Sequence, residues 1–231
     1  MRNLCIIPAR GGSKRIPRKN IRNFCGKPII AYSIEAALQS NLFEEVMVST
    51  DDEEIAQWAA RYGATIPFLR SAQNSNDYAN TVDVLLEVLN RYKETGKHYS
   101  FVCCCYPTAP FVLPQHLSEG YDRLIKKNAA AVFPVVEFSY PIQRSLEMDS
   151  ENAVSMKWPE FMHTRSQDLQ KSFHDAGQWY WLNVKTLLEQ QKILSDQAYG
   201  YLLDPMYVQD IDNESDWQLA EMIYEFIQST A

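Results

Sequence analysis

Apolar positions along the chain alternate between short unbroken runs and longer stretches with helical spacing. The short runs predict buried strands at residues 3–8, 45–49, 65–69, 100–106 and 129–136. The helically spaced stretches predict helices at residues 28–38, 53–62, 81–92, 114–127 and 213–227. Pro28 opens the first helix, Thr50 and Glu53 have the spacing of a capping box, and Gly63 ends the second helix.

Strands that alternate with helices predict an α/β fold, here a three-layer sandwich with a mostly parallel sheet and helices on both faces. One domain over residues 1–231 accounts for the whole pattern. Ligands of such sheets bind beyond the carboxyl ends of the strands. We therefore expect the loop after Pro8, Asp51, Arg70 and the loop at Pro107 to converge on one rim.

Residues 137–182 break this alternation and are rich in aromatic side chains. We interpret the segment as an antiparallel excursion from the main sheet. Large aromatic side chains in a polar setting are typical of protein interfaces, but they also cover small cores. The pattern leaves both interpretations open.

Composition narrows the protein class. The longest apolar runs fall far short of the roughly 20 residues of a membrane span, and the first one is too short for a secretory signal. We therefore expect a cytoplasmic protein with reduced cysteines. Cys103, Cys104 and Cys105 are consecutive, so in a strand they alternate faces and pack as small hydrophobes rather than bind a metal.

The net charge of -7 is unevenly distributed: residues 1–27 hold eight basic side chains and no acid, whereas eight acids and no lysine or arginine follow Lys192. These regions are either two solvated faces or two halves of one site, with cations for phosphates and carboxylates for a metal. An acidic chain with one basic loop favours a small anionic ligand over nucleic acid, which binds an extended basic face.

The basic loop Ala9-Arg-Gly-Gly-Ser-Lys-Arg-Ile-Pro-Arg-Lys-Asn20 directly follows the first predicted strand. Its paired glycines allow backbone N–H groups to approach an anion, and Ser13, Lys14 and Lys19 supply further donors. The loop lacks both the Gly-Lys-Ser/Thr ending of a Walker A motif and a GxGxxG motif, which argues against a P-loop ATPase or an NAD enzyme. The alternative is a solvated basic turn.

The second candidate feature is Gln209-Asp-Ile-Asp-Asn213. If residues 207–211 form a strand, Asp210 and Asp212 share one face, and two carboxylates this close repel unless a cation bridges them. Oxygen ligands that leave room for water and phosphate suit Mg²⁺. Alternatively, Asp212 caps the final helix. The presence of a phosphate loop favours the metal.

The loop ARGGSKRIPRKN resembles the signature of the CMP-sialic acid and CMP-keto-deoxyoctulosonate synthetases, which reads ARxxSKxxPxKN. The segments VSTDDEEIA, FLR, YPTAP and DIDNESD follow in that family's order, so the resemblance covers nearly the whole chain. It implies the α/β fold of the nucleotide-diphospho-sugar transferases and a homodimer. It also implies transfer of CMP from CTP to a nine-carbon 2-keto sugar acid, with release of pyrophosphate.

The resemblance implies roles for individual residues. The CTP phosphates would be bound by Arg10, Ser13, Lys14, Lys19 and Asn20. The cytidine would lie near Arg70, Asn80 and Thr81, and Mg²⁺ would be held by Asp210 and Asp212. Among these residues, Arg10, Lys19 and Asp212 would act in catalysis by neutralising charge and holding the metal.

Two segments that face the sugar in this family differ here. Tyr106 precedes Pro-Thr-Ala-Pro where sialic acid synthetases have Gln, and Ala176-Gly-Gln-Trp-Tyr180 replaces Asn-Gly-Ala-Ile-Tyr. FSYPIQR, RSQDL and HDAGQWYW are instead similar to the branch that acts on pseudaminic acid. We expect Tyr106 and Thr108 at the sugar. Legionaminic, sialic and keto-deoxyoctulosonic acids remain alternative substrates, and a non-catalytic nucleotide-binding regulator remains an alternative function.

We further expect residues 137–182 to pack across a two-fold dimer and to bring Arg165 and Gln178 to a sugar site. The arginine fork suits the carboxylate of the sugar, and the amide of Gln178 suits its hydroxyl or acetamido groups. His174 is a candidate general base, although a lone histidine more often has a structural role.

Overall fold

A mixed seven-stranded sheet forms the centre of the computed structural model, which describes residues 2–76 and 78–230. Its strands are β1 (Asn3–Pro8), β4 (Glu45–Ser49), β5 (Phe101–Cys105), β6 (Ala131–Glu137), β9 (Phe173–Asp175), β10 (Trp179–Asn183) and β11 (Ala198–Leu202). The order across the sheet is β11-β6-β10-β5-β1-β4, and β9 pairs with the C-terminal end of β6.

Most of the sheet is parallel, as the sequence predicts. Strands β4 and β5 both pair in parallel with β1, and β11 pairs in parallel with β6. Strand β10 lies antiparallel between β5 and β6, and β9 is also antiparallel to β6. The carboxyl ends of β1, β4 and β5 therefore lie together on one rim of the sheet.

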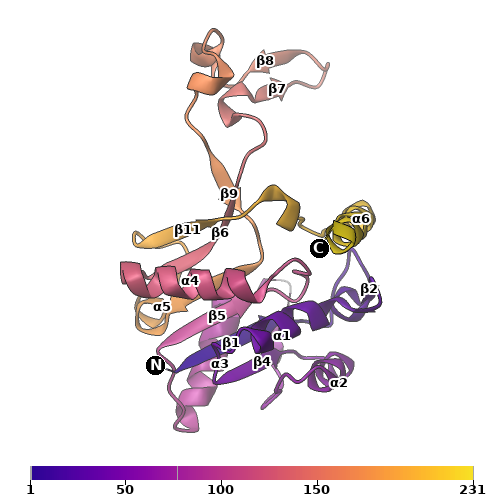
Figure 1. Cartoon of the computed structure of the whole chain (residues 1–231), viewed down its shortest axis with the longest axis vertical. Helices are drawn as coiled ribbons and strands as arrows, with labels where there is room; N and C mark the ends of the chain where they lie inside the picture. Colours follow the sequence, from indigo (N-terminus) through magenta and orange to yellow (C-terminus); the bar gives the residue numbers. More distant parts are fainter. Residues whose placement is uncertain (1, 77, 231) are drawn as a thin grey trace.

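Helices cover both faces of the sheet, which confirms the three-layer sandwich (Figure 1). One face packs against α1 (Ile29–Gln39), α2 (Glu53–Arg61) and α4 (Pro114–Lys127). The other face packs against α3 (Thr81–Glu94) and α5 (Val184–Gln190). The last helix, α6 (Glu214–Thr230), packs beside the sheet against the short hairpin of β2 (Asn23–Phe24) and β3 (Lys27–Pro28).

The three consecutive cysteines pack in β5 as predicted. Cys103 and Cys105 belong to the apolar core on one face of the sheet, together with Cys5, and Cys104 belongs to the core on the other face. Burial raises the pKa of each of these four thiols, that of Cys105 to about 12. They are therefore protonated packing groups and not nucleophiles.

A long excursion projects away from the body between β6 and β9 (Figure 1). We call residues 138–172 the arm. Its regular elements are η3 (Ile142–Arg144), β7 (Leu146–Met148), β8 (Val154–Met156), η4 (Pro159–Phe161) and η5 (Ser166–Asp168). Strands β7 and β8 form an antiparallel hairpin of their own, so the antiparallel character of the excursion is confirmed.

The C-terminal boundary that we predict for this excursion, residue 182, lies too far along the chain. Residues 179–182 belong to β10 in the middle of the main sheet, where the side chains of Trp179 and Trp181 are fully buried. Trp179 packs so closely on α4 that a Cβ at Gly120 would lie 2.4 Å from its ring. These aromatic residues therefore form part of the core, and the prediction that they belong to the excursion is wrong.

Three local predictions are also wrong. Residues 65–69 form no strand but a single bridge from Thr65 to Met47, because Pro67 has no N–H to continue a ladder. Helix α2 is capped by Asp52, whose carboxylate accepts from the Ile55 N–H, and not by Thr50. Residues 207–211 are not a strand, because the chain forms η6 (Pro205–Tyr207) and then runs irregularly to α6.

Within the two described ranges, no helix combines the length and the apolar character that crossing a bilayer requires.

Candidate active site

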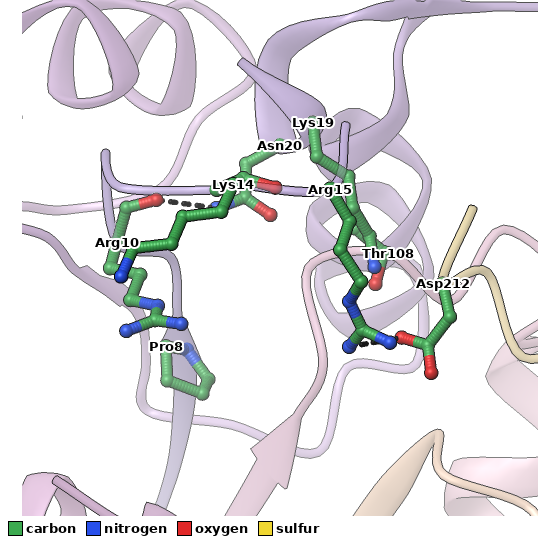
Figure 2. A pocket seen from close by; sticks show the side chains of 9 residues that line it. Pro8, Arg10, Lys14, Arg15, Lys19, Asn20, Thr108 and Asp212 are labelled. Carbon is green, nitrogen blue, oxygen red and sulfur yellow. Dashed lines mark hydrogen bonds and ion pairs between the residues drawn. The ribbon is translucent and has the colours of Figure 1, made fainter. Parts of the chain in front are cut away.

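A cavity of about 390 Å³ opens at the carboxyl end of β1, under the loop that follows it. Six of the residues that line it come from this loop: Arg10, Ser13, Lys14, Arg15, Lys19 and Asn20. Pro8, Thr108 from the loop after β5, and Asp212 from the segment before α6 complete the lining. In Figure 2 the side chains of Arg10 and Lys14 lie on one side of the space, and those of Arg15 and Asp212 lie on the other. The structure thus brings all five predicted phosphate-binding residues together with Thr108 and Asp212.

The position of the loop depends on two neighbouring acids at the end of β4. The Gly11 N–H donates to the Asp51 carboxylate over 3.0 Å. A side chain at Gly11 would lie 2.7 Å from a carboxylate oxygen of Asp52, so this position requires glycine. Gly11 therefore allows the loop to pack closely against the start of α2. The sequence suggested that its N–H faces an anion, but this N–H donates to Asp51 instead. Gly12 differs, because a Cβ there would meet no atom within 4 Å.

The acids of the chain neutralise part of the loop's positive charge. Arg18, in a left-handed conformation with φ 55°, donates to Asp52 over 3.0 Å and also pairs with Glu54. The hydrogen bond from Arg18 lowers the pKa of Asp52. Arg22 pairs with Glu214 at the start of α6 over 2.7 Å. Arg18 lies near the C-terminal end of the loop and Arg22 lies just beyond it, whereas the cations that line the cavity are Arg10, Lys14, Arg15 and Lys19.

Lys19 connects the loop to the acidic segment. Its ammonium group lines the cavity and donates to the backbone carbonyl of Ile211. Burial lowers the pKa of Lys19, and the carboxylates of Asp212 and Asp210 oppose that shift. An ammonium group has three donors, so the bond to Ile211 leaves Lys19 able to bind an anion. Asn20 donates to the Arg10 carbonyl over 2.9 Å, and it therefore shapes the loop.

The two aspartates of the predicted metal site have different surroundings. The Asp212 carboxylate lines the cavity and lies 2.8 Å from the Arg15 guanidinium. Asp210 is exposed and does not line the cavity. The alternative role for Asp212 is wrong: the first turn of α6 is capped by Asn213, which accepts from the Asp216 N–H, while the Asp216 side chain accepts from Asn213 in return.

The three predicted cytidine contacts do not line the cavity. Arg70 is buried, and its guanidinium donates to the hydroxyl of Ser49 over 3.0 Å and to the carbonyl of the same residue. Asn80 forms a capping box with Asp83 at the start of α3. Both residues thus have a structural role in this arrangement. Thr81 lies 3.0 Å from the hydroxyl of Tyr106, to which it is hydrogen-bonded.

Tyr106 is half-buried and packs against a second tyrosine that is itself hydrogen-bonded. Its ring packs on that of Tyr180 with centroids 5.3 Å apart, and the Tyr180 hydroxyl donates to Asp175 over 2.8 Å. Burial raises the pKa of both tyrosines. Both therefore remain protonated and act as hydrogen-bonding groups. The structure places Tyr106 beside Thr81 but not on the cavity wall.

The remaining predicted sugar residues are dispersed. Arg165 lies on the arm, largely exposed and paired with Asp168. Gln178 is only 3% exposed and donates to the carbonyl of Tyr207, so in this arrangement its side chain faces the protein interior and not the cavity. The ring of His174 packs on Phe138 at the base of the arm and does not line the cavity.

Sequence reasoning missed Arg15 as a site residue, although it lines the cavity and faces Asp212. Its position directly after Lys14 in the basic loop was the available signal. The resemblance gave no role to this position, and the ion pair with Asp212 joins residues far apart in the chain.

The sequence and the fold both match those of known proteins. A family model described as Cytidylyltransferase matches residues 4–199. The chain is 43% identical, over the full length of both chains, to a pseudaminic acid cytidylyltransferase of Campylobacter jejuni. It is 33% identical to the CMP-N,N'-diacetyllegionaminic acid synthase of Legionella pneumophila, covering 99% of this chain and 98% of that one.

A solved structure of CMP:2-keto-3-deoxy-manno-octonic acid synthetase complexed with CTP has the same fold, with a TM-score of 0.70 and 17% identity over 99% of this chain and 100% of that one. The full-length similarity extends over the basic loop and the acidic segment that together form the cavity. On these grounds, the chain belongs to the cytidylyltransferase family.

Proposed function

We propose that this enzyme transfers CMP from CTP to the anomeric hydroxyl of pseudaminic acid. The observation that carries the proposal is the cavity in which the cations of the loop after β1 face the carboxylate of Asp212. The similarity to the Campylobacter jejuni enzyme over the whole chain favours pseudaminic acid as the acceptor.

In this reaction, the anomeric oxygen of the sugar forms a bond to the α-phosphorus, and the bond from that phosphorus to the bridging oxygen of pyrophosphate breaks. The chain contributes position and charge. Arg10, Lys14 and Lys19 bind the triphosphate and neutralise the charge that develops on the leaving pyrophosphate. Thr108 on the cavity wall orients the substrate from the side of β5.

The acidic segment fits a magnesium ion. Asp212 presents a carboxylate to a cavity lined by phosphate-binding cations, and Asp210 lies two residues before it. Among the described residues, no three His, Cys, Asp or Glu side chains gather into a metal cluster. This sparse donor set suits Mg²⁺, which keeps several waters and binds substrate phosphates. When bound, the ion would polarise the phosphate oxygens.

We also propose that the enzyme is a homodimer in which the arm of each subunit packs on its partner. The hairpin β7–β8 exposes Leu146, Met148 and Val154, each at least 60% accessible. An isolated two-stranded hairpin is marginally stable, and clustered exposed apolar side chains mark interaction surfaces. In such a dimer, the arm of one subunit would bring its Arg165 to the sugar site of the other, because Arg165 does not line the cavity of its own subunit.

The same proposal places the enzyme in the cytoplasm, where free thiols such as its five cysteines remain reduced. It includes neither nucleic acid nor a membrane as a partner.

The test is pyrophosphate release from CTP with pseudaminic, legionaminic, sialic and keto-deoxyoctulosonic acids, with Mg²⁺ present. We expect the highest kcat/KM with pseudaminic acid. A higher value with another of these acids would reassign the substrate within the family. Binding of CTP without pyrophosphate release from any of them would instead support a non-catalytic nucleotide-binding regulator.

A further inference from the structure

The segment that carries Asp210 and Asp212 lacks the backbone pairing that fixes most of the site. Between η6 and α6, the described chain forms no strand. Two side chains from outside the segment hold its carbonyl groups, and Gln209 within it donates to the Asp210 carbonyl over 2.7 Å. Lys19 donates to the carbonyl of Ile211, and Gln178 donates to the carbonyl of Tyr207. Ile211, between the two aspartates, is buried in the core under α6.

The backbone of Gln178 is held firmly in place, which supports its contact with Tyr207. Its own carbonyl accepts from the Tyr106 N–H over 2.7 Å, directly before β10 enters the main sheet. The preceding Gly177 has φ +64°, a conformation that favours glycine, and its N–H donates to Asp175 over 2.8 Å. The amide of Gln178 is therefore aimed at Tyr207 by the sheet itself.

The surroundings of Gln178 argue against contact with a ligand. The side chain is 3% exposed and does not line the cavity. Its amide nitrogen donates to a partly buried backbone carbonyl that would lose this hydrogen bond without it.

We propose that Gln178 is a positioning residue for the acidic segment: by holding the Tyr207 carbonyl, it fixes the stretch that carries Asp210 and leads to Asp212 on the cavity wall. The inference rests on the proposed function, since it assigns those aspartates to the metal of that reaction. It replaces the expectation that Gln178 reads the sugar. Lys19 holds the same segment at Ile211, four residues further on. Asp210 therefore lies within a stretch that is fixed at both ends, and Asp212 directly follows it.

The test compares two apolar substitutions of buried amides. Gln178→Met keeps the length of the side chain but removes its donor. Asn3→Leu is the matched control, because Asn3 is 4% exposed, donates to the Leu42 carbonyl over 3.1 Å and also has a buried oxygen without a partner. Asn3 lies at the start of β1, whereas the basic loop follows the end of that strand.

Two readouts apply to both variants. One is hydrogen exchange of the backbone amides of residues 206–213 without metal or nucleotide, and the other is the Mg²⁺ concentration that gives half-maximal turnover. We expect Gln178→Met to increase exchange in this segment and to raise that Mg²⁺ concentration about ten-fold, the lower range for losing an outer support of a metal site. The order of preference among sugar acids should not change. Asn3→Leu should change neither readout.

Unchanged exchange and an unchanged Mg²⁺ requirement in Gln178→Met would overturn the proposal. So would an altered sugar preference at an unchanged Mg²⁺ requirement, because that result returns Gln178 to the substrate. The same rise in hydrogen exchange and in the Mg²⁺ requirement of Asn3→Leu would show a general loss of stability. If the parent enzyme released no pyrophosphate from CTP, the proposed function would fail, while the exchange measurement would still decide whether Gln178 holds the segment.

Discussion

Asp212 and Arg15 form an ion pair on one side of the cavity, with side chains that are 42% and 69% exposed. Ion pairs this exposed contribute only about 0–1 kcal/mol to folding. The carboxylate is therefore available to a cation at little cost in stability. The exposed carboxylate of Asp212 differs in this respect from the buried amide of Gln178, whose loss affects the packed interior.

We expect Asp212→Asn to lower Mg²⁺-dependent turnover by about 100-fold or more, the effect of removing one electrostatic group from a polar transition state. The melting temperature should remain within about 2 °C of the parent's, since the lost ion pair is a weak one. Steady-state kinetics and thermal unfolding measure the two effects.

Glu214→Gln is the matched control, because it breaks a comparably exposed pair with Arg22 two residues further along the chain. This variant should keep its turnover. Near-normal activity of Asp212→Asn would refute the metal assignment, and an equal loss in both variants would show that only the fold of this region matters.

At the scale of elements, α4 and η6 meet through one histidine. His116 of α4 is buried, and its ring lies 5.5 Å from that of Tyr207 and 6.0 Å from that of Tyr201. Its Nδ1 has no partner. Burial lowers the pKa of His116, and the nearby Glu119 opposes that shift only in part.

The lowered pKa predicts how stability depends on pH. The unfolded chain binds a proton at His116 more readily than the folded protein does, so protonation favours unfolding. The stability that the neutral side chain of His116 contributes is fully present above the ordinary histidine pKa of about 6.5. This stability is lost as the pH falls below that value. Urea unfolding should therefore show a lower free energy at about pH 5 than at about pH 7.

In His116→Phe, which keeps the ring but cannot titrate, this difference should become smaller. His98→Gln, at an exposed histidine, should retain the dependence of the parent. If His116→Phe and the parent lose the same free energy over this range, the histidine does not contribute.

The elements also show what a sequence can predict. Where an apolar run or a helical stripe packs in the usual way, as in β1, β4 and α4, the predicted and observed bounds agree closely. Residues 65–69 have the same apolar character, and Ile66 and Phe68 do pack against the core, but Pro67 prevents pairing. Apolar character alone thus predicts burial more reliably than it predicts a strand.

The candidate site divides in a similar way. The basic loop was predictable, because many cations in one short segment after a strand form a local signal. The contacts of Gly11 with Asp52 and of Gln178 with Tyr207 join residues far apart in the chain, and no local pattern reports them. The sequence therefore identifies the residues that line the cavity better than it identifies the contacts that hold those residues in place.

For the whole molecule, the arm is the feature that bears on assembly. We expect Met148→Glu, which places a charge on the exposed face of the β7–β8 hairpin, to convert the proposed dimer into monomers in light scattering. The body should remain folded, because the hairpin forms a small sheet separate from the main sheet.

Met222→Glu on α6 is the control, since the two methionines are 66% and 67% exposed. It should leave the mass in solution unchanged. A parent protein that is monomeric and fully active would contradict the role of the arm.

The position of Arg165 on the arm, outside the cavity of its own subunit, has a genetic consequence. If each site takes its arginine from the other subunit, an Arg165→Ala chain and an Asp212→Asn chain are defective in different halves of the site. Coexpressed, random pairing makes about half of all dimers mixed, and each mixed dimer contains one intact site. Two inactive alleles would then complement each other and restore about a quarter of the parental activity.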